Sequence, residues 1–287
     1  MDTPSIWSEI WLENYITSTL LKLHLERSRQ APLTIFLRVY DPELLDVVAA
    51  HPNRWHALWI LCDTLEFLDR ICYLGLPSLE LLVLSLERDC AKSLPMIYSR
   101  LSALKHLQLR RLSASFSASS MTANLLGNSA PHSAFLGNIP AESLTKLSLW
   151  GTTYGSKFPR DSIHFPVLEY LILRIIDPMS FLEAVVAPRL ERFEFSEQYC
   201  GHHICRAFKG PNSKFDNVRH LIFAEFLHVT PHQDTSDMAK ELCQVFHGLR
   251  HATINMQYLF SLFPPAEWWA IQMTTIALST TGCTSRA

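Results

Sequence analysis

Residues 168–173 have the sequence LEYLIL, in which leucine occupies the first, fourth and sixth positions. The same spacing returns in three further stretches, at residues 79–84, 104–109 and 144–149. Four looser copies use other apolar residues at some of these positions, at residues 55–60, 190–195, 218–223 and 249–254. Five of the seven intervals between the starts of the eight copies are 22 to 28 residues long, so the chain contains an internal repeat.

The spacing predicts a short strand in each copy. The fourth and sixth residues lie on the same side of such a strand, because successive side chains alternate between its two faces. One copy cannot bury its apolar side alone, so stacked copies are expected to pair their strands in parallel around a shared core. The pattern and its period are typical of leucine-rich repeats. They predict an α/β solenoid, a curved parallel sheet with helices or irregular segments on its outer face.

Composition narrows the class of protein. Of the 287 residues, 48% are hydrophobic and 18% are charged, which favours a large buried core. The net charge of −2 gives no general attraction to nucleic acid or to an anionic membrane, and neither is expected as a partner. The seven cysteines are odd in number and scattered, without a disulfide framework, which favours a cytoplasmic or nuclear location. No signal peptide is visible, and the apolar window at residues 258–278 is interrupted by two prolines.

Three segments follow from the repeat pattern. Residues 1–31 are expected to cap the solenoid with a helix over 12–30, whose apolar stripe contains Ile16, Leu20 and Leu23, with Leu21 as a further candidate. Residues 32–255 form the repeats, with residues 32–37 as the first strand. A serine-rich stretch at about 113–138 interrupts them as a surface insertion, a degenerate repeat or a phosphorylatable loop. Residues 256–287 diverge from the pattern, and Trp268, Trp269, Ile271 and Ile276 are candidates for a second cap, the other possibility being that the repeats are truncated here.

Two helices with the same design are expected before repeat strands. Residues 41–52 have the sequence DPELLDVVAAHP, in which Asp41 suits the N-cap and Pro42 the first helical position. Residues 177–188 have the sequence DPMSFLEAVVAP, with Asp177 and Pro178 in the same roles and Pro188 as the stop.

The densest group of potential metal ligands is Cys200, His202, His203 and Cys205. Structural zinc sites usually take two ligand pairs separated by a longer loop, and this group has no second pair. No nucleophile-elbow, zinc-protease, phosphate-loop or dinucleotide motif occurs in the chain. We therefore expect no catalytic residues, no metal and no cofactor, and a metal-dependent hydrolase built on this group is the contrary hypothesis.

The remaining candidate for function is the sheet face turned away from the core, which we call the inner face. It is formed by the third, fifth and seventh positions of the copies. The first two copies place apolar and small residues there, namely Ala57, Trp59, Leu61, Leu81, Val83 and Ser85. Basic and aromatic side chains follow, and the predicted partner-binding residues are His106, Arg110, Lys146, Trp150, Tyr170, Arg174, Arg192 and Glu194.

Exposed aromatic side chains beside arginines are typical of binding hot spots. The four cations Arg110, Lys146, Arg174 and Arg192 are expected to hold an acidic or phosphorylated segment of a protein. Trp150 and Tyr170 are expected to supply the apolar anchor beside the charge. Charge reversal at Arg174 is expected to abolish binding and to leave folding intact, because the residue is taken to lie away from packing.

Several segments of the chain also resemble a known family. The first is Thr3-Pro4 with Trp7 and Ile10, the second has Arg27-Ser28 with Pro32-Leu33, and the third has His51 with Arg54-Trp55 and Leu58. In this order and spacing they resemble the repeat region of fungal F-box proteins with leucine-rich repeats, over about residues 2–255.

The resemblance implies the substrate-recognition subunit of an SCF-type ubiquitin ligase, whose repeats bind a protein substrate. In that family an F-box precedes the first of these segments and binds a Skp-type adaptor. This chain begins where the F-box would end, so adaptor binding is expected only if an F-box lies upstream of Met1. The alternative is a leucine-rich-repeat scaffold with no ligase role.

Overall fold

A computed structural model describes residues 3–12, 16–38, 41–62, 70–71, 73–86, 101–112, 141–152, 158–176, 178–197, 214–226, 246, 248–255 and 275–279. The chain forms two compact units, residues 1–152 and residues 153–287. Within the described residues, no helix has both the length and the apolar character needed to cross a membrane.

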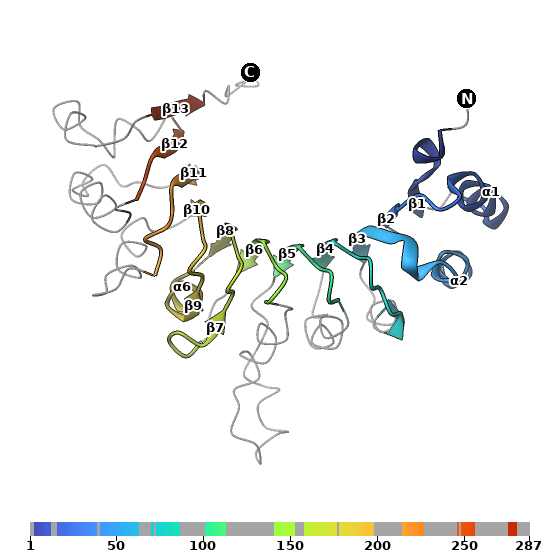
Figure 1. Ribbon diagram of the computed structural model, residues 1–287, viewed down its shortest axis with the longest axis horizontal. Coiled ribbons are helices and arrows are strands. Elements are labelled where there is room, and N and C mark those ends of the chain that lie inside the picture. The colour runs from blue at the N-terminus through green and yellow to red at the C-terminus, as the bar shows by residue number, and fades with distance from the viewer. Residues whose placement is uncertain are drawn as a thin grey trace, which may run out of the picture. The chain divides into compact units, whose positions relative to one another are not determined.

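The first unit is built on a run of parallel strands that pair in the order of the sequence (Figure 1). These strands are β1 (Glu9–Leu12), β2 (Leu33–Leu37), β3 (Trp55–Cys62), β4 (Leu81–Leu86), β5 (His106–Leu112) and β6 (Lys146–Thr152). Helices α1 (Ser18–Ser28) and α2 (Pro42–Ala49) and the 3-10 helices η1 (Pro4–Trp7) and η2 (Pro52–Arg54) belong to the same unit. Neighbouring parallel strands need crossover connections, and α1 and α2 supply two of them.

Strand register places the apolar repeat positions in two straight rows across the first unit. One row is Ile10, Ile35, Leu58, Leu82, Leu107 and Leu147, and the next is Leu12, Leu37, Ile60, Leu84, Leu109 and Leu149. None of these side chains is more than 3% exposed. The prediction that the fourth and sixth positions form the core is therefore confirmed, and the copies stack with these positions aligned.

The N-terminal end of this unit differs from the expectation. The sheet begins with β1, one strand earlier than the expected first strand, and β1 has the alternating burial of a half-covered strand. Helix α1 begins only at Ser18, where the Thr17 side chain caps it. Leu20 and Leu23 are 43% and 37% exposed, so their place in the expected apolar stripe was wrong. Leu21, the further candidate, is buried together with Leu25, because residues four apart share the helix face that packs on the core.

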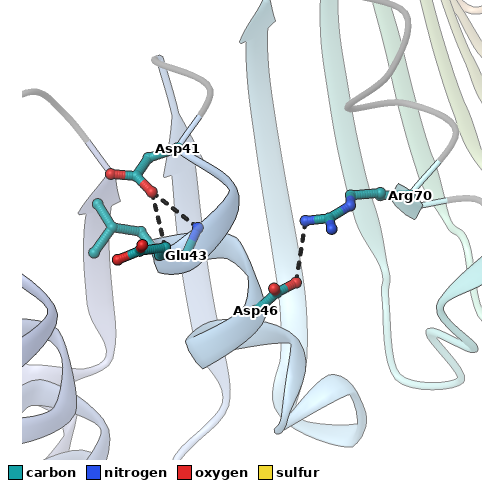
Figure 2. Close-up of polar contacts among 5 residues, drawn as sticks. Asp41, Glu43, Asp46 and Arg70 are labelled. Atoms are coloured by element: carbon teal, nitrogen blue, oxygen red, sulfur yellow. Dashed lines mark hydrogen bonds and ion pairs between the residues drawn. The ribbon is translucent and has the colours of Figure 1, made fainter.

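The expected design of the second helix is confirmed. Asp41 precedes α2 and its Oδ1 accepts hydrogen bonds from the backbone N–H groups of Glu43, at 2.9 Å, and Leu44, at 3.2 Å (Figure 2). Pro42 occupies the first turn, where its missing N–H has no intrahelical partner to lose. On the same helix, Asp46 forms an exposed ion pair with Arg70 at 3.2 Å (Figure 2).

Arg54 joins two of the sequence segments that carry the family resemblance. Its guanidinium donates hydrogen bonds to the backbone oxygens of Leu25 and Ala31 and, at 2.5 Å, to the hydroxyl of Ser28. These groups lie at the C-terminal end of α1, where backbone oxygens lack intrahelical partners and a cation is favourable. Trp55 is fully buried and donates from its Nε1 to the Val48 oxygen.

The first resembling segment packs on the same helix. The Trp7 ring of η1 meets His24 edge-on, with 5.1 Å between ring centroids, and the Arg27 guanidinium lies 5.0 Å from the Trp7 centroid. Ile10 follows in β1 and is fully buried. The segments that carry the resemblance therefore form one packed N-terminal end around α1.

The second unit is a further run of parallel strands, again paired in the order of the sequence (Figure 1). They are β8 (Tyr170–Ile176), β10 (Arg192–Glu197), β11 (His220–Phe226), β12 (His251–Asn255) and β13 (Thr275–Ser279). Leu171, Phe193, Leu221 and Ala252 align across four of these strands and none is more than 2% exposed. Strand β13 follows the stretch where the repeat pattern was expected to have ended, so the sheet continues further than predicted.

The second of the two similar helices is shorter than expected. Helix α6 (Met179–Ala184) has Pro178 at its N-cap and ends at Ala184. Val185 and Val186 form the short strand β9 (Val185–Val186), which pairs in parallel with β7 (Ile163–His164). Helix α2 keeps Val47 and Val48 helical, so the pairing of β9 with β7, and not the valines themselves, accounts for the early end of α6. Asp177 lies outside the described residues.

Candidate functional site

The inner face is formed by residues that alternate with the core rows. On β2 the burial pattern alternates between buried and half-buried side chains, and β8 has the same alternation over its whole length. Several inner-face residues are small and nearly buried; Ser85 and Ser148 are 8% and 3% exposed. The larger residues between them therefore determine what this face offers to a partner.

Three aromatic side chains form a stacked row on the inner face of the first unit. Trp11, Phe36 and Trp59 are register partners on β1, β2 and β3. The rings of Trp11 and Phe36 are 3.9 Å apart and 6° from parallel, and those of Phe36 and Trp59 are 5.5 Å apart and 25° from parallel. Trp11 is 50% exposed, and Leu61 on β3 is 36% exposed. We call these four side chains the apolar row.

Arg110 lies on the same face of the same unit. Its guanidinium is 5.1 Å from the ring centroid of Trp150, a cation–π contact. With the Gln108 amide turned so that its oxygen faces the guanidinium, that oxygen accepts from Arg110 Nε at 2.8 Å and Nη2 at 3.1 Å. Both partners are neutral, so within the described residues the arrangement orients the charge of Arg110 without compensating it.

Two further basic residues are register partners on the same two strands, four residues before Arg110 and Trp150. His106 on β5 pairs with Lys146 on β6. Burial, and then the charge of Lys146, lower the pKa of His106 below its usual 6.5, so the imidazole is mainly neutral at neutral pH. Lys105 lies just before β5 and forms an ion pair with Glu80 at 2.8 Å, and its hydrogen bond lowers the pKa of that carboxyl.

The second unit contains a different arrangement, centred on Glu194. Tyr170 Oη donates to Glu194 Oε2 at 2.9 Å, and Arg174 Nη2 donates to Glu194 Oε1 at 2.7 Å. The Arg192 guanidinium lies 4.8 Å from the Tyr170 ring centroid. Burial, and then the hydrogen bond to Glu194, raise the pKa of Tyr170 to about 12. We call these four residues the Glu194 cluster.

The Glu194 cluster corrects one expectation. Arg174 does not lie away from packing, because it forms an ion pair with a carboxylate whose residue is only 9% exposed. Removing or reversing its charge leaves that carboxylate without its cation, and this affects folding as well as any partner. The other predicted residue of this unit, Arg192, is exposed.

A pair of histidines continues the inner face of the second unit. His220 on β11 and His251 on β12 are register partners with 4.6 Å between their ring centroids. Burial, and then the charges of His251 and Arg192, lower the pKa of His220. The His220 imidazole is therefore mainly neutral at neutral pH.

The structure groups the predicted residues by unit. His106, Arg110, Lys146 and Trp150 lie together in the first unit, and Tyr170, Arg174, Arg192 and Glu194 lie together in the second. The sequence prediction missed Trp11 and Phe36 as members of the same face. The alternation of exposed and buried residues in β1 and β2 is the signal that could have revealed them.

The candidate metal ligands Cys200, His202, His203 and Cys205 lie outside the described residues, as does the serine-rich stretch at 113–138. Trp268, Trp269 and Ile271 of the proposed second cap also lie outside them. In the part of the chain that the structure describes, no three His, Cys, Asp or Glu side chains are close enough to hold a metal ion.

The repeated strands, their register and their aligned core define the class: the fold is an α/β leucine-rich-repeat solenoid. A solved structure similar to this chain is the leucine-rich-repeat-containing protein LegL7 from Legionella pneumophila. The TM-score is 0.53 at 15% sequence identity, over 96% of this chain and 83% of that one. No protein-family model matches the chain, and no curated protein matches it either. The likeness to LegL7 therefore supports the fold alone.

Proposed function

We propose that this chain is a non-catalytic scaffold that binds another protein on the inner face of its first unit. The observation that carries the proposal is the combination, on one sheet face, of the apolar row with an Arg110 whose partners are neutral. Tryptophan, other aromatic residues and arginine are the side chains enriched in protein-binding hot spots. A rigid sheet that displays them loses little conformational entropy when a partner binds.

The more specific proposal is a substrate-recognition subunit of an SCF-type ubiquitin ligase. It rests on the resemblance in the segments around Trp7, Ser28 and Arg54, which pack together around α1. In this proposal the inner face holds the protein substrate, and a Skp-type adaptor binds only through an F-box encoded upstream of Met1. The proposed location is the cytoplasm or the nucleus. The alternative is the same scaffold without a ligase role.

Site-specific photo-crosslinking tests the scaffold. A photoreactive phenylalanine analogue replaces Trp59 on the inner face in one variant and Asp46 on helix α2 in the matched control. We expect covalent adducts with the same protein partners, repeatedly, from position 59 and not from position 46. Equal adducts from both positions, or none from position 59, would contradict the proposal.

Co-purification tests the ligase role separately. The 287-residue chain and the product extended upstream of Met1 are each co-expressed with a Skp-type adaptor. We expect the adaptor to co-purify with the extended product alone. If an upstream reading frame encodes no F-box, or if the extended product fails to retain the adaptor, the ligase role is wrong and the scaffold proposal is unaffected.

A further inference from the structure

Ring stacking occupies part of the aromatic surface of the apolar row. Trp11, Phe36 and Trp59 are stacked on one another, so the faces between them are already occupied. The Trp150 face is likewise covered by the Arg110 guanidinium. Nucleic-acid bases need open ring faces on which to stack, and stacking leaves Phe36 with neither face open to a base. Ring edges suit the bulky apolar side chains of a peptide, including aromatic rings in edge-to-face contact.

Arg110 adds a second requirement on the partner, which must carry an anionic side chain. Its stacking on Trp150 and its bonds to Gln108 orient a planar group that can hold a carboxylate with two parallel hydrogen bonds. Lys146 lies on the neighbouring strand opposite His106, about 13 Å along the strand from the position of Arg110, so the acidic side chain is assigned to Arg110 alone. Since the partners of Arg110 in the described residues are neutral, an acidic side chain from outside would not have to displace an internal carboxylate.

The strand register determines the distance between the side chains that take the apolar residue of the partner and the Arg110 guanidinium that takes its acidic residue. Leu61, Ser85 and Arg110 are aligned on β3, β4 and β5, so Leu61 and Arg110 are two strand spacings apart. At about 4.8 Å per strand this is roughly 10 Å, and the diagonal from Trp59 to Arg110 is roughly 12 Å. An extended peptide advances about 3.3 Å per residue, so either distance corresponds to about three to four residues. Ser85 lies between them in the register and is 8% exposed.

We propose that the first unit recognises an extended peptide segment with a bulky apolar side chain and an acidic side chain about three to four residues apart. The apolar side chain packs on Trp59 and Leu61, and the acidic one binds Arg110. This inference rests on the proposed scaffold function and identifies the chemistry of its partner. The Glu194 cluster of the second unit has no part in it.

Selection from a random-peptide display library on the folded, immobilised chain tests the inference. We expect the selected peptides to share an aromatic or large aliphatic residue and a Glu or Asp at the stated separation. Peptides selected in parallel on Arg110→Glu should carry Lys or Arg in place of the acidic residue, at the same separation. Peptides selected on Trp59→Ala should show no preference for the bulky apolar residue. For a selected peptide made synthetically, Arg110→Gln should weaken binding about ten- to a hundredfold.

Arg70→Glu is the matched control, because it reverses the same charge beside α2, and its selected motif should equal that of the parent chain. The inference is overturned if no motif is selected, if the motif lacks an acidic position, or if Arg110→Glu selects the parent motif. It is also overturned if single-stranded RNA displaces the selected peptide at physiological salt. These results leave the crosslinking from position 59 unaffected, so failure of the peptide motif is distinguishable from failure of the scaffold.

Discussion

Arg110 in the first unit and Arg174 in the second occupy the same repeat position, the seventh, and both lie on the inner face near an aromatic ring. Their surroundings differ at several positions, and the fifth position of the following repeat decides whether the charge meets a carboxylate. There the fifth residue is Ser148 in the first unit and Glu194 in the second. Arg110 is therefore held by the neutral groups of Trp150 and Gln108, whereas Arg174 is neutralised by Glu194.

Two arginines at the same repeat position can therefore have different roles. Arg110, whose partners among the described residues are neutral, keeps its charge for a partner. A cation bound to a buried carboxylate holds its own unit together, and its loss costs stability because that carboxylate loses its partner. The predictions below test this contrast, beginning with the core that both arrangements share.

The largest loss of stability is expected in the core that lies beneath Arg110 and beneath the Glu194 cluster. Leu107 and Leu171 lie at the fourth position of their repeats and are 1% and 0% exposed. Leu→Ala at either position should lower the free energy of unfolding by about 2–5 kcal/mol, because it removes buried contacts and leaves a cavity. Urea unfolding of the two variants measures it. The neighbouring Gln108→Ala should cost far less, and equal losses at positions 107 and 108 would show that the assigned strand register is wrong.

The next effect should be confined to the second unit. Glu194→Ser removes the acceptor of Tyr170 and Arg174, and we expect a loss of about 1–3 kcal/mol, discounted because Arg174 remains partly solvated. A double-mutant cycle with Arg174→Gln should show coupling of about 1 kcal/mol in urea unfolding. Additive losses would mean that the ion pair contributes nothing and that Arg174 resembles Arg110 after all.

A smaller effect is expected in the ultraviolet titration of Tyr170, which belongs to the Glu194 cluster. The pKa of Tyr170 is raised to about 12 from the usual 10.0, so its contribution to stability is complete below pH 10 and is lost as the pH rises through 12. Ultraviolet titration of the parent chain against Tyr170→Phe should reveal one late-ionising phenol. In Glu194→Gln the phenol should ionise at lower pH, since its charged acceptor is gone. An unchanged titration would show that Glu194 does not influence the tyrosine.

The smallest stability change is expected at Arg110. Arg110→Gln removes a half-exposed cation–π contact, so its cost should be about 0.5–1 kcal/mol or less. Thermal unfolding of Arg110→Gln and Arg174→Gln, measured side by side, should show the larger drop for Arg174. The reverse order would overturn the distinction between an oriented cation and a neutralised one.

Much of the fold could be predicted from local patterns. The leucine spacing predicted strands at Leu82, Leu107, Leu147 and Leu171, and all four are buried as expected. Asp41 and Pro42 predicted the start of α2 for the same reason, since a cap depends on neighbouring residues alone. The prediction missed β1 and misplaced the end of α6, because each of those is settled by pairing with a distant strand.

The sequence by itself determined the repeat, the parallel sheet and the face on which each side chain lies, because strand alternation and repeat period are properties of the chain's own spacing. It also provided the basic and aromatic residues of the inner face. Only the tertiary structure decided which of those cations is compensated. Arg174 and Glu194 are 20 residues apart in sequence but 2.7 Å apart in space, and Trp11 joins Phe36 and Trp59 only when three strands pair. Charge compensation and ring stacking depend on distance through space, which is set by strand register across repeats.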